Sequence, residues 1–341
     1  MIEQPDDLIE HTVSWETIDM DMLGELLSSM RLSGGVFLDG EMAGPWSIHS
    51  KLREEECAAY CIDPAHIIAY HYVRSGWLSC QVGDGAPVVV RAGEIVILPR
   101  NVGHLLHGPV PGVPVDGHDI IQAPDEDGMF RVRIQGDGEK TAIYCGFLAS
   151  TTPEHVLLKS LPPIMVISLD DASKSDWIRR SVEFAVQGLS RDSPETVGKL
   201  AEGLFAEAVR RYIENTPVEE AGLIAGLKDP AVGRTIALIH ARYAEPITLD
   251  DLAREAGLSK TVLGERFKGL LGQSPMQYCA YWRMYVAADM LRNNRQNATS
   301  VAYSVGFNSE AAFTRAFKRE FGLPPAAWQR QAADAGLLSS D

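Results

Sequence analysis

The stretch GFNSEAAFTRAFKREFGLPP (Gly306–Pro325) repeats the pattern of an earlier stretch, GLSKTVLGERFKGLLGQSP (Gly257–Pro275). A shift of fifty positions aligns the serine near each start, the Phe-Lys pair in each middle and the glycine and proline at each end. Two copies are too few for a solenoid, which needs at least three repeats to bury a continuous core. The sequence therefore predicts a duplicated functional module.

Each copy predicts two helices joined by a tight turn. Gly257 and Gly306 end the first helices, because glycine adopts positive φ at little cost, and Ser259 and Ser309 cap the second helices. Apolar residues spaced four apart bury one face of each second helix, which leaves the opposite face free. We expect that free face to contact DNA through Ser259, Lys260, Thr261, Gly264, Glu265, Lys268, Ser309, Glu310, Ala311, Thr314, Arg315, Lys318 and Arg319.

The apolar segment PMQYCAYWRMYVAADML (Pro275–Leu291) predicts a long helix that joins the two units rigidly. Successive major grooves on one side of a duplex lie ~34 Å apart, so one rigid chain can contact two half-sites of double-stranded DNA. Short paired helices with apolar residues at this spacing also occur in helical domains that bind no DNA. The coincidence of both turns, both caps and basic helix ends favours the DNA-binding interpretation.

The net charge of −15 at first opposes nucleic-acid binding, which needs Lys and Arg. However, residues 1–234 carry 19 basic and 36 acidic residues, a balance of −17, whereas residues 235–341 carry 12 and 10, a balance of +2. No apolar run suggests a membrane span or a signal peptide, so we expect a cytoplasmic protein. Five cysteines without CxxC spacing favour reduced thiols.

The region from about Gly34 to Ile167 consists of short β-rich runs separated by Gly, Pro and Asp, which predicts a sandwich or barrel. A long loop is expected at 107–128, and the acidic run at 54–56 is expected to be solvated. From Lys174 the pattern becomes helical, and two amphipathic segments predict a helical hairpin. Its apolar residues are expected to contact a second copy or, alternatively, to cap the sheet; they are Trp177, Phe184, Leu200, Leu204 and Phe205.

The segment from about Pro230 to Arg330 resembles the DNA-binding domain of the AraC family of transcription regulators. SVAYSVGFNSEAAFTRAFKREFGLPPAAWQR follows the family pattern of a Gly-Phe turn, an F-x-R-x-F-K core and a G-x-x-P-x-x-[WY] ending. Upstream, GGVFLDGEMAGPWSI, HYVRSGWLSCQVGDG, AGEIVILPRNVGHLL and KTAIYCGFL, followed by LLKSLPPIMVI, resemble the cupin-type sensor domain of one branch of that family.

The resemblance implies an α+β protein with four parts. These are a cupin-like β-barrel over 1–170, a helical dimerisation hairpin over 171–216, a linker over 217–229 and a double helix-turn-helix domain over 230–332. The expected function is that of a homodimeric transcription regulator, more an activator than a repressor, that works with RNA polymerase. Thr261, Gly264 and Glu265 stand where relatives often have Trp, Gln or Arg in contact with bases, so the DNA sequence that this chain recognises does not follow from the operators of those relatives.

Enzyme motifs such as GxSxG, GxxxxGK[ST] and HExxH are absent from the sequence, so we expect no enzyme. The alternative class is a cupin-type metal-dependent enzyme or metal-binding module fused to a DNA-binding domain. The spacing Gly93-x5-Pro99-x4-His104 keeps the outline of the second cupin motif, but the first motif is missing. If a metal binds, its plausible ligands are His71, His104, His107 and Cys145.

A sensor pocket is expected inside the cupin-like domain, because a ligand acts on DNA binding only through elements that lead towards the helices. Its expected residues are His71, Trp77, His104, His107, Tyr144 and Cys145. An oxidant, a soft metal and a small organic ligand all remain possible effectors, and no cofactor is required.

Overall fold

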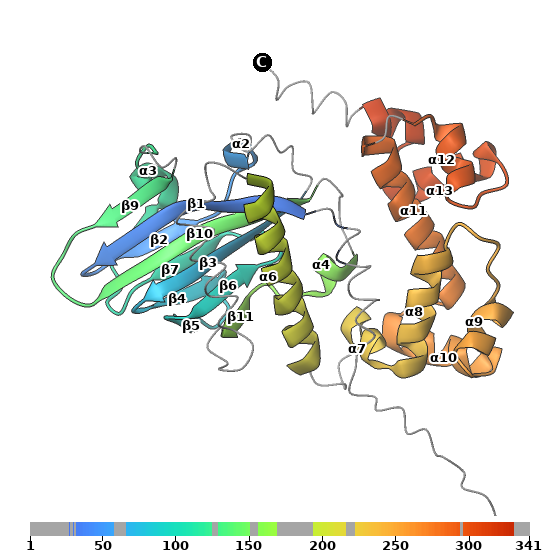
Figure 1. Cartoon of the computed structure of the whole chain (residues 1–341), viewed down its shortest axis with the longest axis horizontal. Helices are drawn as coiled ribbons and strands as arrows, with labels where there is room; N and C mark the ends of the chain where they lie inside the picture. Colours follow the sequence, from blue (N-terminus) through green and yellow to red (C-terminus); the bar gives the residue numbers. More distant parts are fainter. Residues whose placement is uncertain are drawn as a thin grey trace, which may run out of the picture.

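The computed structural model describes residues 27, 30, 32–57, 66–124, 129–150, 156–168, 194–215, 222–293 and 296–330. Strands make up most of the described chain up to residue 168, and helices make up nearly all of it from residue 194 (Figure 1). The expected α+β class is therefore confirmed. No helix among the described residues is long and apolar enough to cross a membrane.

The strands form two sheets, and the core between them contains side chains from both. The first sheet has the order β11-β6-β3-β10-β1-β9, and the second has the order β5-β4-β7-β2-β8. The strands are β1 (Leu32–Ala43), β2 (Ser47–Ser50), β3 (His66–Ser75), β4 (Trp77–Val82), β5 (Val88–Arg91), β6 (Glu94–Leu98), β7 (His104–His107), β8 (Pro114–Asp116), β9 (Phe130–Ile134), β10 (Lys140–Ser150) and β11 (Met165–Ser168).

This arrangement corrects the expected closed barrel, because the described strands pair as two separate sheets. The β-rich runs of the sequence are strands as predicted, whereas β2, β7, β8 and β11, at three or four residues each, are too short for a periodic signal. The expected long loop at 107–128 contains β8 and the short helix α3 (Gly117–Ile120).

Strand register brings distant residues together at the centre of the first sheet. In the antiparallel β3–β10 pair, His71 lies opposite Cys145, and Cys145 also lies opposite Leu38 of β1. In the second sheet, His104 of β7 lies opposite Ser50 of β2. The core between the sheets contains Leu38, Ile48, Ala69, Leu106, Ile143 and Cys145 among its buried residues.

Helix α6 (Pro194–Asn215) packs against β1 and shares a buried core with the first sheet (Figure 1). Phe205 and Val209, 1% and 0% exposed, join Ile68 and Tyr70 in this core, and Leu204 is half-buried against it. Part of the predicted dimerisation surface therefore covers a sheet. The first helix of the predicted hairpin, with Trp177 and Phe184, and the Leu200 side chain lie outside the described residues, so contact with a second copy stays a prediction.

The remaining helices build the C-terminal region and two small connections. Helices α7 and α8 pack with α10, and α12 packs with α13. Their bounds, with those of the short helices, are α2 (Glu54–Cys57), α4 (Val156–Ser160), α7 (Leu223–Lys228), α8 (Pro230–Arg242), α9 (Leu249–Glu255), α10 (Lys260–Leu271), α11 (Pro275–Asn293), α12 (Ala298–Ser304) and α13 (Glu310–Phe321). The expected linker at 217–229 thus contains a helix, α7, because Leu223, Ile224 and Leu227 are buried.

Helix α11 joins the two helical units by contributing to both of their cores. Tyr278 and Trp282 in its first half pack in the core shared with α8 and α10, whereas Ala288 and Leu291 in its second half pack with α12 and α13. The predicted connecting helix is therefore present and packs in both cores. Helix α4 contacts α7, so one continuous apolar core runs from the first sheet into the helical region.

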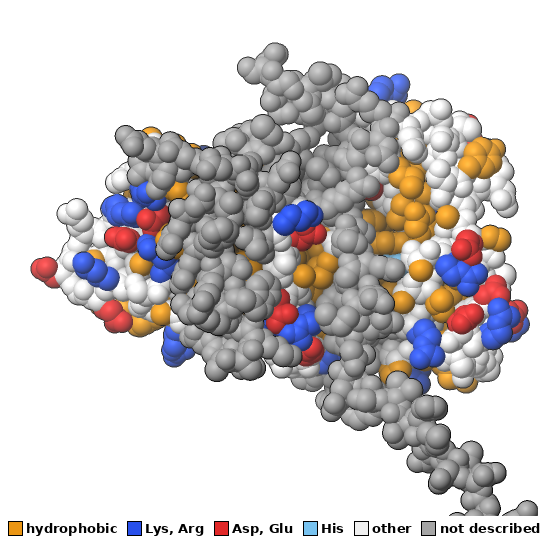
Figure 2. All heavy atoms as spheres, viewed as in Figure 1, with side chains coloured by type: hydrophobic (Ala, Val, Ile, Leu, Met, Phe, Trp, Pro, Cys, Tyr) orange, Lys and Arg blue, Asp and Glu red, His pale blue; other side chains and the backbone are white. Residues whose placement is uncertain are grey.

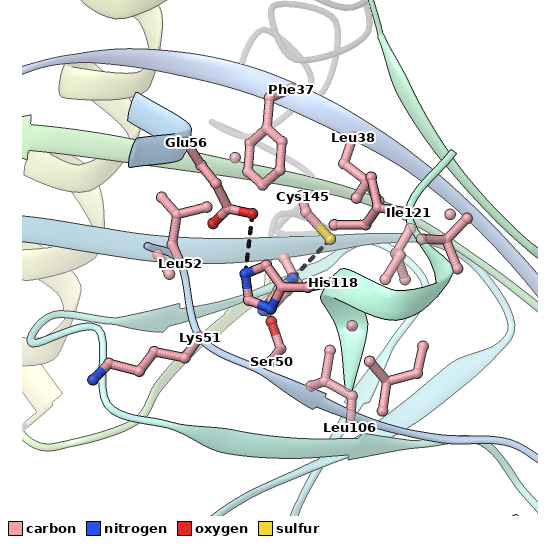
Figure 3. A pocket seen from close by; sticks show the side chains of 18 of the residues that line it. Phe37, Leu38, Ser50, Lys51, Leu52, Glu56, Leu106, His118, Ile121 and Cys145 are labelled. Carbon is pink, nitrogen blue, oxygen red and sulfur yellow. Dashed lines mark hydrogen bonds and ion pairs between the residues drawn. The ribbon is translucent and has the colours of Figure 1, made fainter. Parts of the chain in front are cut away.

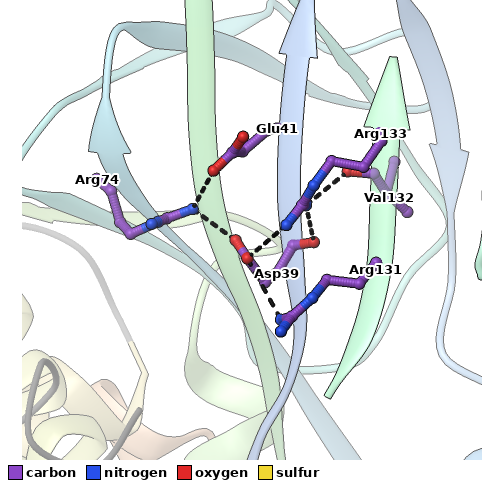
Figure 4. Close-up of polar contacts among 6 residues, drawn as sticks. All are labelled: Asp39, Glu41, Arg74, Arg131, Val132 and Arg133. Carbon is purple, nitrogen blue, oxygen red and sulfur yellow. Dashed lines mark hydrogen bonds and ion pairs between the residues drawn. The ribbon is translucent and has the colours of Figure 1, made fainter. Parts of the chain in front are cut away.

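A cluster of charged residues lies on β1, β3 and β9 (Figure 4). The Asp39 carboxylate accepts hydrogen bonds from Arg74 at 2.5 Å, Arg133 at 2.8 Å and Arg131 at 3.3 Å. Arg74 also lies 3.5 Å from Glu41. Because the Asp39 side chain is only 12% exposed, its negative charge needs these partners.

Candidate DNA-binding surface and sensor pocket

The first helix-turn-helix consists of α9 and α10. A capping box between Thr248 and Asp251 begins α9, and Gly257 then turns the chain with φ of 68°. The Ser259 side chain accepts a hydrogen bond from the Val262 N–H at the start of α10. The turn glycine and the serine cap predicted from the sequence are both confirmed.

The second helix-turn-helix, α12 and α13, has the same construction. Asn297 caps α12, Gly306 turns with φ of 82°, and Ser309 accepts a hydrogen bond from the Ala312 N–H to cap α13. A Cβ atom at Gly306 would lie 2.6 Å from the carbonyl oxygen of Ala244. Glycine is therefore required there by close approach as well as by its φ angle.

Each second helix has one buried and one exposed face. Leu263, Phe267, Phe313 and Phe317 are all 0% exposed. Of the thirteen residues predicted to contact DNA, Gly264 and Thr314 are half-buried and the others are exposed. The structure thus leaves the predicted faces accessible on both units, and Figure 2 shows acidic and basic side chains interspersed over α9 and α10.

The two exposed faces differ in their available positive charge. On α10, Lys260 lies 2.9 Å from Asp250, and Arg266 donates to Asp229 at 2.6 Å. On α13, Arg315, Lys318 and Arg319 have no ion-pair partner within the described part of the chain. Electrostatic attraction to phosphate should therefore come mainly from the second unit.

A pocket of about 650 Å³, solvent at its opening included, lies in the cupin-like region. Figure 3 shows Phe37, Leu38, Ile121 and Leu106 among its walls, with the Cys145 thiol at its inner side. The lining residues come from both sheets and from α2 and α3, and they are mostly apolar.

Cys145, His71 and His104 form a chain of hydrogen bonds at the inner side of the pocket. His71 Nδ1 lies 2.9 Å from Cys145 Sγ, His71 Nε2 lies 2.8 Å from His104 Nε2, and His104 Nδ1 lies 2.9 Å from the Val102 carbonyl oxygen. Burial, together with the neighbouring His104, lowers the pKa of His71 well below 6.5. Burial lowers the pKa of His104 to about 4 and raises that of the Cys145 thiol. All three groups are therefore uncharged near neutral pH.

The structure places the six predicted pocket residues in two groups. His71 and Cys145 line the pocket, and His104 contacts His71 from behind. Tyr144 faces the opposite side of β10 because side chains alternate along a strand, and the Arg74 guanidinium lies 4.2 Å from its ring centre. His107 bonds to the Gly108 carbonyl oxygen, and neither it nor Trp77 is among the lining residues.

Two polar side chains at the pocket opening, those of Glu56 and His118, were not predicted as site residues. His118 of α3 lies 3.0 Å from Glu56 of α2 and 2.7 Å from Asp116 (Figure 3 shows the first contact). Glu56 therefore has a partner, which corrects the expectation of a solvated side chain for this residue; the side chains of the other two glutamates of the run lie outside the described residues. The Asp116-Gly117-His118 turn signal was present in the sequence, but its partner lies 62 positions away, counted from 56 to 118.

The proposed metal ligands do not surround a common point. His71 uses one ring nitrogen for Cys145 and the other for His104, so the three donors form a line. His107 bonds elsewhere. Among the described residues, no group of three or more His, Cys, Asp or Glu side chains is arranged to hold a metal ion. The four described cysteines, Cys57, Cys80, Cys145 and Cys279, are buried free thiols.

The fold and the paired helices define a cupin-type domain followed by a helix-turn-helix DNA-binding domain. A family model described as "Cupin" matches residues 21–214, more than half of the chain, and one described as "Helix-turn-helix domain" matches 252–331. The chain belongs to the AraC family of transcription regulators, in the branch with an N-terminal cupin domain.

Relatives align over nearly their full length. A protein of Streptomyces lividans described as an AraC-like transcription regulator is 29% identical, over 91% of this chain and 98% of its own. The HTH-type transcriptional regulator MtrA of Neisseria gonorrhoeae is 26% identical, over 92% and 99%. A solved AraC-type regulator from Chromobacterium violaceum is 27% identical, over 30% of this chain and 93% of its own, with a TM-score of 0.30.

Proposed function

We propose that this DNA-binding transcription regulator places α10 and α13 in successive major grooves and is controlled by an effector in the cupin domain. The observation that carries this proposal is the connection through α11, whose two halves belong to the two cores. This connection fixes the spacing of the two exposed helix faces. A single chain can then contact a site longer than one groove.

The two units are proposed to have unequal roles. Among the described residues, Arg315, Lys318 and Arg319 of α13 supply three unpaired positive charges, whereas the exposed face of α10 has Lys268 as its unpaired cation beside Thr261 and Glu265. A glutamate in the major groove can accept a hydrogen bond from the N4 amino group of cytosine, and a threonine methyl can contact thymine. We therefore propose that α13 supplies most of the affinity and that α10 adds discrimination between sequences.

Operator binding by an Arg315→Ala variant tests the proposed contact surface. If Arg315 pairs with a guanine, the variant should bind an operator mapped by genome-wide footprinting about 1–3 kcal/mol more weakly at fixed salt. Arg234→Ala is the matched control, because Arg234 is an exposed arginine of α8 in the same domain. Equal affinities of both variants and the unchanged chain would remove Arg315 from the DNA contact surface.

Control by the cupin domain is proposed to pass through the continuous apolar core. Cys145 of β10 lies in the core between the two sheets, whereas Leu148 of the same strand belongs to a second core, which continues through Leu157 of α4 to Leu227 of α7, so the coupling is proposed to cross the sheet through β10. A ligand that favours one packing of this core can shift the helical region by as much free energy as it distinguishes between two states.

Assembly and direction of regulation complete the proposal. We expect a homodimer formed through the helical segment 176–212, which sedimentation velocity of the full chain at micromolar concentration tests directly. A sample that remains monomeric would contradict this part.

One relative, RclR of Escherichia coli, is named a transcriptional activator, and we propose the same direction here, with RNA polymerase as the partner. Transcription in vitro from the mapped operator with purified polymerase checks it: a decrease would indicate a repressor.

A further inference from the structure

The hydrogen-bond chain at the inner side of the pocket has one consistent arrangement of protons. The Val102 carbonyl can only accept, so His104 carries its proton on Nδ1 and accepts at Nε2. His71 must then donate from Nε2 to His104, and its Nδ1 accepts from the Cys145 thiol. Both ring nitrogens of His71 and of His104 are thereby hydrogen-bonded within the protein.

This arrangement disfavours two of the three effector classes considered for the sensor. A soft metal bound by His71 and Cys145 would have to displace the thiol proton that Nδ1 accepts, and no third His, Cys, Asp or Glu among the described residues is placed to complete the site. An oxidant reacts with a thiolate, whereas the Cys145 thiol is buried, donates to His71 and has a raised pKa. The inner side of the pocket therefore offers a neutral, unreactive surface.

The charged and polar side chains at the opening of the pocket are either paired with each other or directed away from its interior. His118 Nε2 lies 3.0 Å from the Glu56 carboxylate, and His118 Nδ1 lies 2.7 Å from that of Asp116. Lys51 is exposed, and its side chain points away from the interior in Figure 3. An ionic ligand would lose its hydration without meeting a countercharge inside, which is costly.

The walls are mainly aliphatic and aromatic. They are formed by Phe37, Leu38, Met42, Ile48, Leu52, Leu106, Ile121, Val132 and Ile143. Sites with apolar walls and few polar groups are typical for small organic molecules, and the lining of this pocket has that character.

We infer that this pocket binds an uncharged, mainly apolar small organic molecule, which lies between the two sheets against Cys145 and His71. The inference rests on the proposed function for its role as a signal, but the binding itself does not require DNA. Binding of such a ligand is favourable because it removes apolar surface of the ligand and of the pocket walls from water. It also leaves the hydrogen bonds among Cys145, His71 and His104 intact.

Fluorescence of N-phenyl-1-naphthylamine, a neutral apolar probe, tests the inference with the full chain in the absence of DNA. One probe molecule should bind per chain, and methyl benzoate should displace it. Benzoate and benzylammonium, which have the same ring with a negative or positive charge, should displace it at least about tenfold less well. Equal competition by the charged compounds, displacement by Zn²⁺, or no saturable binding of the neutral compounds would overturn the inference.

Two variants locate the site. Ile143→Trp adds bulk to the wall and should abolish probe binding, and the matched control Val113→Trp, at an 86% exposed position, should leave it unchanged. If Ile143→Trp does not fold, Leu106→Phe replaces it. Unchanged binding by a folded pocket variant would place the ligand elsewhere. Binding that is intact but has no effect on operator affinity or transcription would instead contradict the proposed function.

Discussion

Acidification should destabilise the cupin domain through the buried histidines His71 and His104. In the unfolded chain, both take up protons as the pH falls through about 6.5. In the folded chain, burial keeps them neutral, His104 down to a pH of about 4. Between these values the unfolded state binds more protons, so the free energy of unfolding decreases as the pH falls. Above pH 6.5 this contribution does not change.

The size of the effect follows from the pKa of His104. Its pKa lies at about 4 against 6.5 in the unfolded chain, and each pH unit between these values corresponds to about 1.4 kcal/mol. His104 alone should therefore remove about 3 kcal/mol between pH 6.5 and 4. The lowered pKa of His71 acts in the same direction. For a domain of this size, 3 kcal/mol lowers the Tm by roughly 6–12 °C.

Scanning calorimetry of the full chain from pH 7 to pH 4.5 measures the predicted decrease. Operator DNA identifies the transition of the helical region, because a ligand raises the Tm of the part it binds. The control is the double variant His71→Leu and His104→Leu, which replaces both partners of the central hydrogen bond with apolar side chains. Its cupin transition should depend much less on pH in this window. An equal pH dependence in both proteins would refute the assigned role of the two histidines.

Three further predictions follow from single positions. Gly264→Ala should raise the free energy of unfolding of the helical region by about 1 kcal/mol, because alanine favours a helix over glycine and a Cβ there meets nothing within 4 Å. The same variant should weaken operator binding. Gly269→Ala, equally unobstructed on the same helix, should stabilise the helical region without weakening operator binding. Calorimetry and fluorescence anisotropy separate the two effects, and an unchanged affinity for the first variant would contradict close approach of α10 to DNA. Lys318→Ala should reduce the slope of log Kd against log salt by about 1, whereas a slope equal to that of the unchanged chain would exclude a phosphate contact. Asp39→Ala should lower the free energy of unfolding by about 1–3 kcal/mol, because three guanidinium groups lose their shared acceptor; urea unfolding with no such loss would contradict this.

Local signals determined the helical region from the sequence alone. Gly257 and Gly306 adopt positive φ, and Ser259 and Ser309 cap the following helices, because these features depend on residues only a few positions apart. The repeat of the pattern then distinguished a functional pair from an ordinary helical domain. The same local reasoning missed β8 and α7, because the pairing of β8 with β2 and the burial of the apolar side chains of α7 depend on residues far away in the sequence.

The sensor pocket depended on contacts that no local pattern encodes. The sequence identified His71, His104 and Cys145 as chemically interesting, but only the register of β3 against β10 placed His71 opposite Cys145, 74 positions away. Alternation along the strands then directed Tyr144 to the opposite side, since one residue of offset reverses the face. The sequence by itself thus determined the family, the two units and the exposed faces of their second helices. The tertiary structure alone decided that His71, His104 and Cys145 form a neutral hydrogen-bonded chain behind an apolar pocket, because the pairing of distant strands sets which side chains are buried together.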